Sequence, residues 1–223
     1  MRRPRFIAEQ ARHAHGLLGR FIAFIMARET WVENQRAIAA LDLRSSDHVL
    51  DIGCGHGRSL GALAARAGSV VGVDPSDLMA EIAVTRNRAF VKAGKVQVMI
   101  ASAADIPAAD AAFDKAICVH VIYFWKDIQA CLREIARVLK PGGCLVLVFR
   151  TNADKAAVEA FPADVYSFRP RTDVIEALNA AGFVVDEAGS AQADRQTPTL
   201  IVACKRHDAL AEANAAEDRT HAH

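Results

Sequence analysis

The sequence has 223 residues, of which 52% are hydrophobic and 24% are charged. Because a typical domain has ~150 residues, this length indicates one domain with an appendage, and the composition excludes a wholly disordered chain. The 27 Lys and Arg residues nearly balance the 26 Asp and Glu residues, so the net charge of +1 gives no global reason to expect a nucleic-acid partner. No apolar run approaches the ~18 to 20 residues that cross a bilayer.

The start of the chain precedes the first predicted strand and indicates two helices over residues 5–41. Apolar pairs such as Leu17 and Phe21 have the i, i+4 spacing of an amphipathic helix. Residues 1–36 also carry seven Arg against three Glu. We expect residues 1–41 to form a helical lid, packed on the domain's own sheet or over its ligand cleft. A basic helix with weak contact to a membrane surface is the alternative.

Short β-branched runs alternate with Ala- and Leu-rich stretches through the middle of the chain. The runs predict strands at 48–52, 70–73, 96–100, 116–119 and 145–149, and the stretches predict helices at 59–67, 77–91 and 128–139. Apolar strands separated by helices indicate a parallel sheet that is covered on both faces. Pro141, Gly142 and Gly143 are expected to stop the last of these helices and turn the chain into the next strand.

After the fifth predicted strand the pattern changes to a helix at 173–181 and two strands at 183–187 and 199–205, with no crossover helix between the strands. Such strands form an antiparallel hairpin at the edge of the sheet. The predicted fold class is therefore α/β: a doubly wound, mostly parallel seven-stranded sheet with an antiparallel C-terminal hairpin strand, in one domain over residues 42–206. Residues 207–223 lack an apolar stripe, and we expect a flexible tail there.

The cysteines bear on the compartment of the protein. They are odd in number and contain no C-x-x-C pair, which favours reduced thiols over a disulfide framework. The five positions are Cys54, Cys118, Cys131, Cys144 and Cys204. The apolar run at residues 21–27 is short and flanked by arginines, which argues against a signal peptide. We therefore expect a cytoplasmic protein.

The most informative stretch is an apolar strand that runs into a G-x-G-x-G turn, with a helix after it. The glycines Gly53, Gly55 and Gly57 allow the backbone to bend tightly and a ligand to lie against it. Free N–H groups at the start of the following helix suit a polar or anionic ligand group. Asp74 ends the second strand, 21 residues past Gly53, where a carboxylate can accept hydrogen bonds from a ribose diol.

The sequence of the same loop indicates which kind of ribose-containing cofactor it can bind. A dinucleotide site requires glycine at the sixth position of the motif, but Arg58 stands there, which disfavours a pyrophosphate cradle. A P-loop is excluded because no G-K-[ST] follows. A cofactor with a ribose and no phosphate fits better.

Five motifs in chain order resemble those of class I S-adenosylmethionine-dependent methyltransferases, in particular the small-molecule type (methyltransferase-domain-11-like). The matching segments are 49–57, 71–74, 102–107, 113–118 and 132–143. The resemblance implies a Rossmann-like methyltransferase fold with S-adenosylmethionine as the cofactor. It also implies S-adenosylhomocysteine as the product, and no metal.

The resemblance further implies roles for single residues. The glycines would approach the methionine moiety of the cofactor, and Asp51 would support its ammonium group. Asp74 would hold the ribose, and Asp105 would bind the adenine amino group. The candidate cofactor-binding residues are Asp51, Gly53, Cys54, Gly55, Gly57, Asp74, Pro75, Ala104, Asp105 and Val119.

The segment from Val119 to Trp125 follows the fourth strand and should face the transferred methyl group, because the carboxyl ends of the strands line the cleft. His120 and Tyr123 are the candidate catalytic residues, and His120, Tyr123, Phe124 and Trp125 form the candidate acceptor pocket. His120 can act as a base or orient the acceptor, and a histidine of the core is the open alternative. Common small-molecule members of the family carry two histidines at the places of Tyr123 and Phe124, so no particular substrate follows.

The predicted function is transfer of a methyl group by in-line displacement to a small-molecule acceptor, which can be an amine, a hydroxyl compound or a lipid-like molecule. We expect a monomer or homodimer without a nucleic-acid partner, because the acceptor motifs of DNA methyltransferases are absent. Two alternatives remain open. One is a non-catalytic regulatory protein that binds S-adenosylmethionine, and the other is a nucleotide-dependent oxidoreductase.

Overall fold

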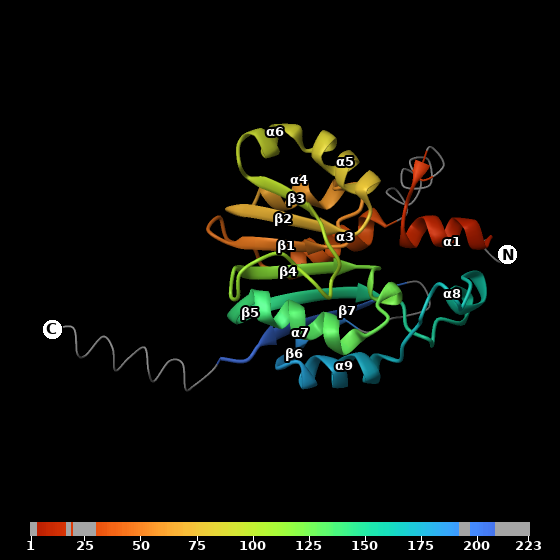
Figure 1. Ribbon diagram of the computed structural model, residues 1–223. Helices are drawn as coiled ribbons and strands as arrows, with labels where there is room; N and C mark the ends of the chain where they lie inside the picture. The colour runs from red at the N-terminus through yellow and green to blue at the C-terminus, as the bar shows by residue number, and fades with distance from the viewer. Residues whose placement is uncertain (1–3, 17–18, 20–29, 192–196, 208–223) are drawn as a thin grey trace.

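A seven-stranded sheet forms the centre of the molecule, as a computed structural model of residues 4–16, 19, 30–191 and 197–207 shows (Figure 1). The strand order is β3-β2-β1-β4-β5-β7-β6. The strands are β1 (His48–Ile52), β2 (Ser69–Asp74), β3 (Val96–Ile100), β4 (Phe113–Val119), β5 (Leu139–Phe149), β6 (Phe183–Ala191) and β7 (Thr199–Lys205). Strand β7 pairs antiparallel with β5 and β6, and all other pairs are parallel. The predicted fold class is confirmed.

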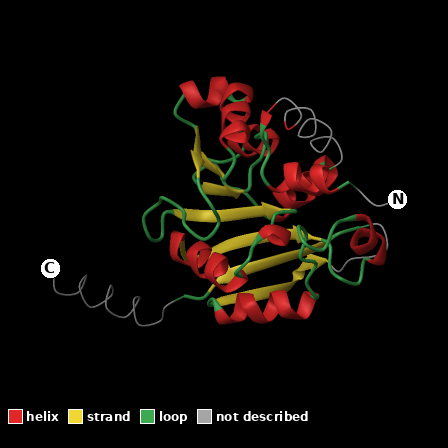
Figure 2. Cartoon of the chain, turned by 45° about the vertical axis from the view of Figure 1, so that its right-hand side comes forward, coloured by secondary structure: helices red, strands yellow, loops and turns green. Residues whose placement is uncertain are grey.

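Helices lie on both faces of this sheet (Figure 2). In the described residues they are α1 (Arg5–Arg12), α3 (Trp31–Ala40), α4 (Arg58–Ala64), α5 (Asp77–Arg86), α6 (Arg88–Lys92), α7 (Ile128–Val138), α8 (Lys155–Ala160) and α9 (Arg171–Ala180), with a short 3-10 helix η1 (Ile122–Phe124). None of the described helices is long and apolar enough to cross a membrane.

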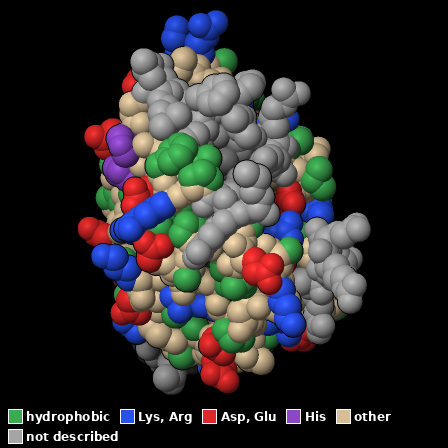
Figure 3. Space-filling model, turned by 90° about the vertical axis from the view of Figure 1, so that its right-hand side faces the viewer, with side chains coloured by type: hydrophobic (Ala, Val, Ile, Leu, Met, Phe, Trp, Pro, Cys, Tyr) green, Lys and Arg blue, Asp and Glu red, His purple; other side chains and the backbone are tan. Residues whose placement is uncertain are grey.

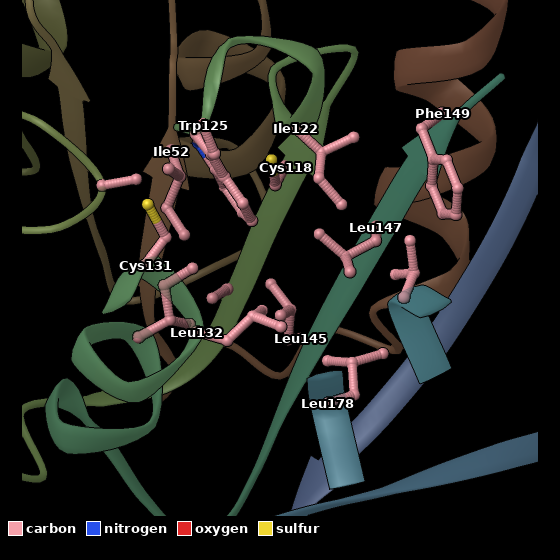
Figure 4. Close-up of a cluster of buried hydrophobic side chains, with 14 of the residues drawn as sticks. Ile52, Cys118, Ile122, Trp125, Cys131, Leu132, Leu145, Leu147, Phe149 and Leu178 are labelled. Carbon is pink, nitrogen blue, oxygen red and sulfur yellow. The ribbon is translucent and has the colours of Figure 1, made fainter. Parts of the chain in front are cut away.

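Strand β5 shows how the two layers of the core arise. Successive strand residues point to opposite faces, so Val146 joins the cluster under α3, α4 and α5, whereas Leu147 joins the cluster under α7 and α9. In the second cluster, Leu132 of α7 and Leu178 of α9 lie beside Leu145 and Leu147 (Figure 4). Burial on both faces explains why this strand reads as a continuous apolar run.

Two predicted boundaries are wrong because single residues end or distort an element. The helix predicted at 77–91 is interrupted at Asn87, whose side chain donates hydrogen bonds to the carbonyl oxygens of Gly57 and Ala83 at 2.8 and 2.9 Å. The Pro141–Gly143 stretch does follow α7, but it lies inside β5. The register between β4 and β5 shifts at this place, in the manner of a β-bulge.

Only part of the predicted N-terminal helical segment lies within the described residues. Helices α1 and α3 lie within the predicted helical segment. Helix α1 lies beyond the ends of the parallel strands (Figure 1), whereas α3 packs on one face of the sheet, with Ala37 and Ile38 in the core. The apolar pair Leu17 and Phe21, and most of the basic arm between the two helices, fall outside the described residues. The same holds for residues 208–223 of the predicted tail.

One cysteine pair contradicts the expectation of reduced thiols. Strands β5 and β7 place Cys144 opposite Cys204, and the two sulfur atoms form a disulfide. An odd count and a missing C-x-x-C pair carry no information about this contact, since the two residues are 60 positions apart and meet only when the sheet forms. Cys54, Cys118 and Cys131 are free and buried.

Candidate active site

A cavity of about 490 Å³ opens at the carboxyl ends of β1, β2, β4 and β5. Its walls are the loop after β1, the segment after β4, and residues from α1, α3 and the stretch around α8. Figure 3 faces the side of the molecule on which α1 and α8 lie, where acidic and basic side chains alternate with exposed hydrophobic ones. The cavity therefore lies where a doubly wound sheet places its ligands.

Three glycines of the loop after β1 adopt positive φ angles, and two of them, Gly53 and Gly55, lie against the cavity. Gly53 has φ +68°, and a Cβ atom there would lie 2.4 Å from Cγ2 of Val121, so only glycine fits. Gly55 has φ +52° and no atom within 4 Å of the place of a Cβ, which leaves its backbone open to a ligand. Both residues and Cys54, which are predicted to bind the cofactor, line the cavity.

Gly57 has a different role from the one that the resemblance implied. Its φ is +72°, and a Cβ atom would lie 2.7 Å from Cβ of Ala83 and 2.8 Å from Nδ2 of Asn87. The residue lets α4 begin close to α5, and it does not line the cavity. The periodicity of the sequence could not separate a glycine that faces a ligand from one that faces a helix.

Two of the predicted carboxylates lie in the cavity wall. Asp74 accepts hydrogen bonds from the N–H groups of Gly55 and Ser76, both at 2.9 Å, and burial raises its pKa. Asp51 accepts a hydrogen bond from the hydroxyl of Ser59. Burial raises the pKa of Asp51 to about 7, and the negative charge of Asp74 acts in the same direction. An arriving cation would stabilise the ionised form of Asp51.

Sequence reasoning missed a third carboxylate. Glu33 of α3 lines the cavity, and its buried Oε2 atom has no hydrogen-bond partner. Basic residues stand in the same wall: the guanidinium of Arg58 lies 4.1 Å from the ring centroid of Trp31, and Arg150 pairs with Asp154 at 2.6 Å. The wall thus offers charges of both signs, which suits a zwitterionic ligand group.

A second cavity of about 270 Å³ shares Arg12, Gly53, Val121 and Phe124 with the first, and Pro75 and Trp125 also line it. Trp125, predicted for the acceptor pocket, does not line the large cavity with His120, and it packs in the hydrophobic cluster that also contains residues of α7. Ser102 and Ala103 line this second cavity. Ala104 and Asp105 are exposed and line neither cavity, although Asp105 was expected to bind adenine.

His120, Tyr123 and Phe124 do meet in the large cavity, with Val119 beside them. His120 has φ +60°, and its N–H donates to the carbonyl oxygen of Val148 at 2.8 Å. Its Nδ1 atom lies 3.0 Å from the hydroxyl oxygen of Tyr123. Burial and the charge of Arg150 lower the pKa of His120 to about 4, so its ring is neutral at pH 7.

An aromatic wall completes the cavity, and sequence reasoning did not include it. The ring centroids of Tyr123 and Phe168 are 5.0 Å apart, those of Phe124 and Tyr166 are 4.8 Å apart, and those of Phe161 and Tyr166 are 4.5 Å apart. These distances are typical of packed aromatic pairs. The sequence did contain a signal for this wall, namely the three aromatic residues Phe161, Tyr166 and Phe168 within eight positions after the fifth strand.

Comparison with known proteins agrees with this geometry. Residues 50–147 match a family model described as a methyltransferase domain. The chain is 36% identical over 110 residues to the O-methyltransferase resE of Aspergillus sclerotiorum, a match that covers 49% of this chain and 42% of that protein. The chain spans less than half the length of the fungal O-methyltransferases that it matches.

A bacterial relative and a solved structure match over more of their length. The chain is 30% identical over 162 residues to the uncharacterized methyltransferase YdaC of Bacillus subtilis, which covers 72% of this chain and 84% of that protein. A chain from a solved complex with the Haloferax volcanii Trm112 methyltransferase activator shares the fold with a TM-score of 0.72 at 22% identity, over 93% of this chain and all of that one. This chain belongs to the class I S-adenosylmethionine-dependent methyltransferase family.

Proposed function

We propose that this chain transfers a methyl group from S-adenosylmethionine to a small-molecule acceptor. The observation that carries the proposal is the division of one cavity into two chemically different walls. The open backbone of Gly55 and three carboxylates form one wall, and an aromatic cluster forms the other. A charged, ribose-containing cofactor suits the first wall, and the apolar body of an acceptor suits the second.

The residues of the first wall fit the cofactor group by group. Asp74 would hold the ribose, since its carboxylate lies at the end of β2 and lines the cavity. Asp51 and Glu33 would face the ammonium and sulfonium charges, and basic residues such as Arg58 would face the carboxylate. The second cavity, with Pro75 and Ala103 in its wall, would accept the flat adenine ring.

When bound, S-adenosylmethionine supplies an activated methyl group on its sulfonium sulfur. The chain's own contribution is alignment and exclusion of water, and orientation of this kind can lower a barrier by several kcal/mol. Phe124, Tyr166 and Phe168 would hold the acceptor from one side. Helices α1 and α3 supply Arg12 and Trp31 to the wall, in the manner of a lid.

The lid is part of the proposal, and it rests on contacts at both ends of α1. The hydroxyl of Ser76 donates to the carbonyl oxygen of Ala14 at 2.6 Å, just after the helix. At the other end, Arg5 pairs with Asp164 at 3.2 Å. Residues 1–41 would therefore cover the acceptor site while residues 42–206 carry the cofactor site.

Isothermal titration with S-adenosylmethionine, S-adenosylhomocysteine and NAD tests the proposal. We expect both adenosyl compounds to bind and NAD to bind at least tenfold more weakly. Asp74→Asn should weaken binding by about 1 to 3 kcal/mol through the loss of buried hydrogen bonds to the ribose. Asp105→Asn is the matched control, because that side chain lies outside both cavities, and it should leave the affinity within twofold.

Each alternative predicts a different outcome. Equal or tighter binding of NAD would favour an oxidoreductase and overturn the proposal. Binding of S-adenosylmethionine without formation of S-adenosylhomocysteine across a broad panel of phenols, catechols, amines and fatty acids would favour a regulatory protein. Thermal unfolding of each variant in parallel separates a lost contact from a lost fold.

A further inference from the structure

The hydroxyl of Tyr123 connects two elements of the cavity wall. Its oxygen lies 2.5 Å from the backbone nitrogen of Arg150, at the end of β5, and 3.0 Å from Nδ1 of His120, at the end of β4. A backbone N–H group can only donate, so the oxygen of Tyr123 accepts in the first contact. This hydrogen bond therefore runs from the N–H of Arg150 to the oxygen of Tyr123.

The second contact can use the proton that the phenol still has. Nδ1 of His120 lies within hydrogen-bond distance of the Tyr123 oxygen, so the geometry allows Tyr123 to donate to it. A neutral imidazole has one nitrogen that donates and one that accepts, so Nδ1 is the acceptor when Tyr123 donates. The ring proton of His120 then belongs on Nε2. Burial and the charge of Arg150 support this assignment, because they keep the imidazole neutral.

Three further features hold the ring in place. The backbone of His120 adopts the left-handed region at φ +60°, which is uncommon for a residue other than glycine. Its N–H donates to the carbonyl oxygen of Val148 at 2.8 Å, which fixes the backbone next to the sheet. The rings of His120 and Tyr123 are nearly parallel, with an interplanar angle of 16°. The side chain is thus restrained from both ends.

We propose that Tyr123 is a positioning residue that holds His120 in its Nε2–H form, so that His120 offers a hydrogen-bond donor to the cavity instead of a base. For the proposed function, on which this consequence rests, the preferred acceptor has an oxygen lone pair to receive that hydrogen bond. The acceptor loses its own proton to a group other than His120, or before it binds. Phenolates, carboxylates and enolates meet this requirement.

Nitrogen NMR of the histidine rings tests the proposal directly. The full chain labelled with ¹⁵N is measured at pH 7 by long-range proton–nitrogen correlation, and the His120 signals are identified by their absence in His120→Gln. We expect a protonated Nε2 and an unprotonated, hydrogen-bonded Nδ1. In Tyr123→Phe, the Nδ1 signal should move toward that of a nitrogen without a hydrogen bond. Tyr166→Phe makes the same chemical change nearby and should leave the His120 signals in place.

A protonated Nδ1 in the wild-type protein would overturn the inference, whatever the activity of the enzyme. So would His120 signals that are the same in the wild type and in Tyr123→Phe. The measurement requires no methyl donor, and its outcome is separate from that of the proposed function. If the protein fails to bind S-adenosylmethionine but His120 has this tautomer, the proposed methyl transfer is contradicted. The inferred role of Tyr123 in positioning His120 then still holds.

Discussion

The loop after β1 and the segment after β4 face the same cavity, yet they are held in place by different means. The loop depends on its backbone: Gly53 and Gly55 have positive φ, and the N–H groups of Gly53 and Cys54 donate to the carbonyl oxygen of Val73 at 2.8 and 3.1 Å. The segment depends on side chains, since its position rests on aromatic packing and on the hydrogen bonds of Tyr123.

The difference determines which substitutions each region tolerates. A backbone-held loop is sensitive to an added Cβ atom, whereas a region held by side chains is sensitive to a lost ring or hydroxyl. The two regions touch where Gly53 faces the side chain of Val121. The proposed cofactor site and the proposed acceptor site are therefore in mechanical contact there.

The largest effect is expected for Gly53→Ala. The new Cβ would lie 2.4 and 2.9 Å from the two Cγ atoms of Val121, at a φ of +68°. Backbone strain and overpacking together should lower the free energy of unfolding by about 2 to 5 kcal/mol. Urea unfolding measures the loss, and titration with S-adenosylhomocysteine measures the damage to the site.

Two matched variants show whether the contact is responsible. Gly55→Ala has positive φ but open space, so it should cost only about 1 to 2 kcal/mol of strain. Val121→Ala combined with Gly53→Ala should recover part of the stability that Gly53→Ala alone loses. Equal losses in Gly53→Ala and Gly55→Ala would contradict the mechanical connection.

The next largest effect concerns the strand that leads to Arg150. The Cys144–Cys204 disulfide closes a loop between residues 60 positions apart, and such a crosslink typically contributes about 2 to 4 kcal/mol. Replacing both cysteines with alanine should lower the urea midpoint, while the affinity for S-adenosylhomocysteine stays within twofold. A reducing agent should have the same effect on the wild type and none on the double variant. An unchanged wild-type midpoint on reduction would contradict the crosslink.

The sequence predicted the parts of the fold and site that depend on local pattern. The doubly wound, mostly parallel sheet follows from apolar runs and crossover helices, and the place of Gly53 and Asp74 in the cavity wall follows from their position at strand ends. A glycine with positive φ leaves a clear sequence signal because few other residues can replace it.

Features that depend on tertiary contacts could not be predicted. Helix α8 differs, since its cap is local: Asp154 accepts a hydrogen bond from the N–H of Ala157 at 2.9 Å, but a helix of 6 residues is too short to show an apolar period. The disulfide depends on strand register, which brings together two residues 60 positions apart. Asp105 stands in the expected motif, yet the conformation of its loop leaves the side chain exposed.

A smaller effect is expected for the pH dependence of cofactor binding. Burial raises the pKa of Asp51 from its ordinary 3.8 to about 7, so the folded protein retains a proton that the unfolded chain loses. The stability of the free protein should therefore fall as the pH rises from about 4 to 7. Affinity for the cationic cofactor should change in the opposite direction, because only the ionised carboxylate attracts it.

Titration calorimetry at pH 6.0 and 7.5 measures this dependence. Between these values the ionised fraction of Asp51 rises severalfold, so the affinity for S-adenosylmethionine should rise by about three- to tenfold. Asp51→Asn should bind more weakly and lose most of the dependence. A wild-type affinity that is flat over this range would show that Asp51 does not face the cofactor's charge.

The smallest effects concern α1, which is held near one end by Ser76 and at the other by Asp164. Near the end of β2, the Ser76 hydroxyl is buried, donates to Ala14 and accepts from the N–H of Met79 at 3.3 Å. Ser76→Ala should therefore lower the free energy of unfolding by about 1 kcal/mol and increase the dissociation rate of S-adenosylhomocysteine severalfold.

The other end of the helix is held by Arg5 and Asp164, which are both more than half exposed. Solvent screens such a pair, so Arg5→Ala should change stability by less than about 0.5 kcal/mol and the dissociation rate by less than twofold. A larger effect of Arg5→Ala than of Ser76→Ala would mean that the lid is anchored on the acceptor side, which would reverse the comparison between the two regions.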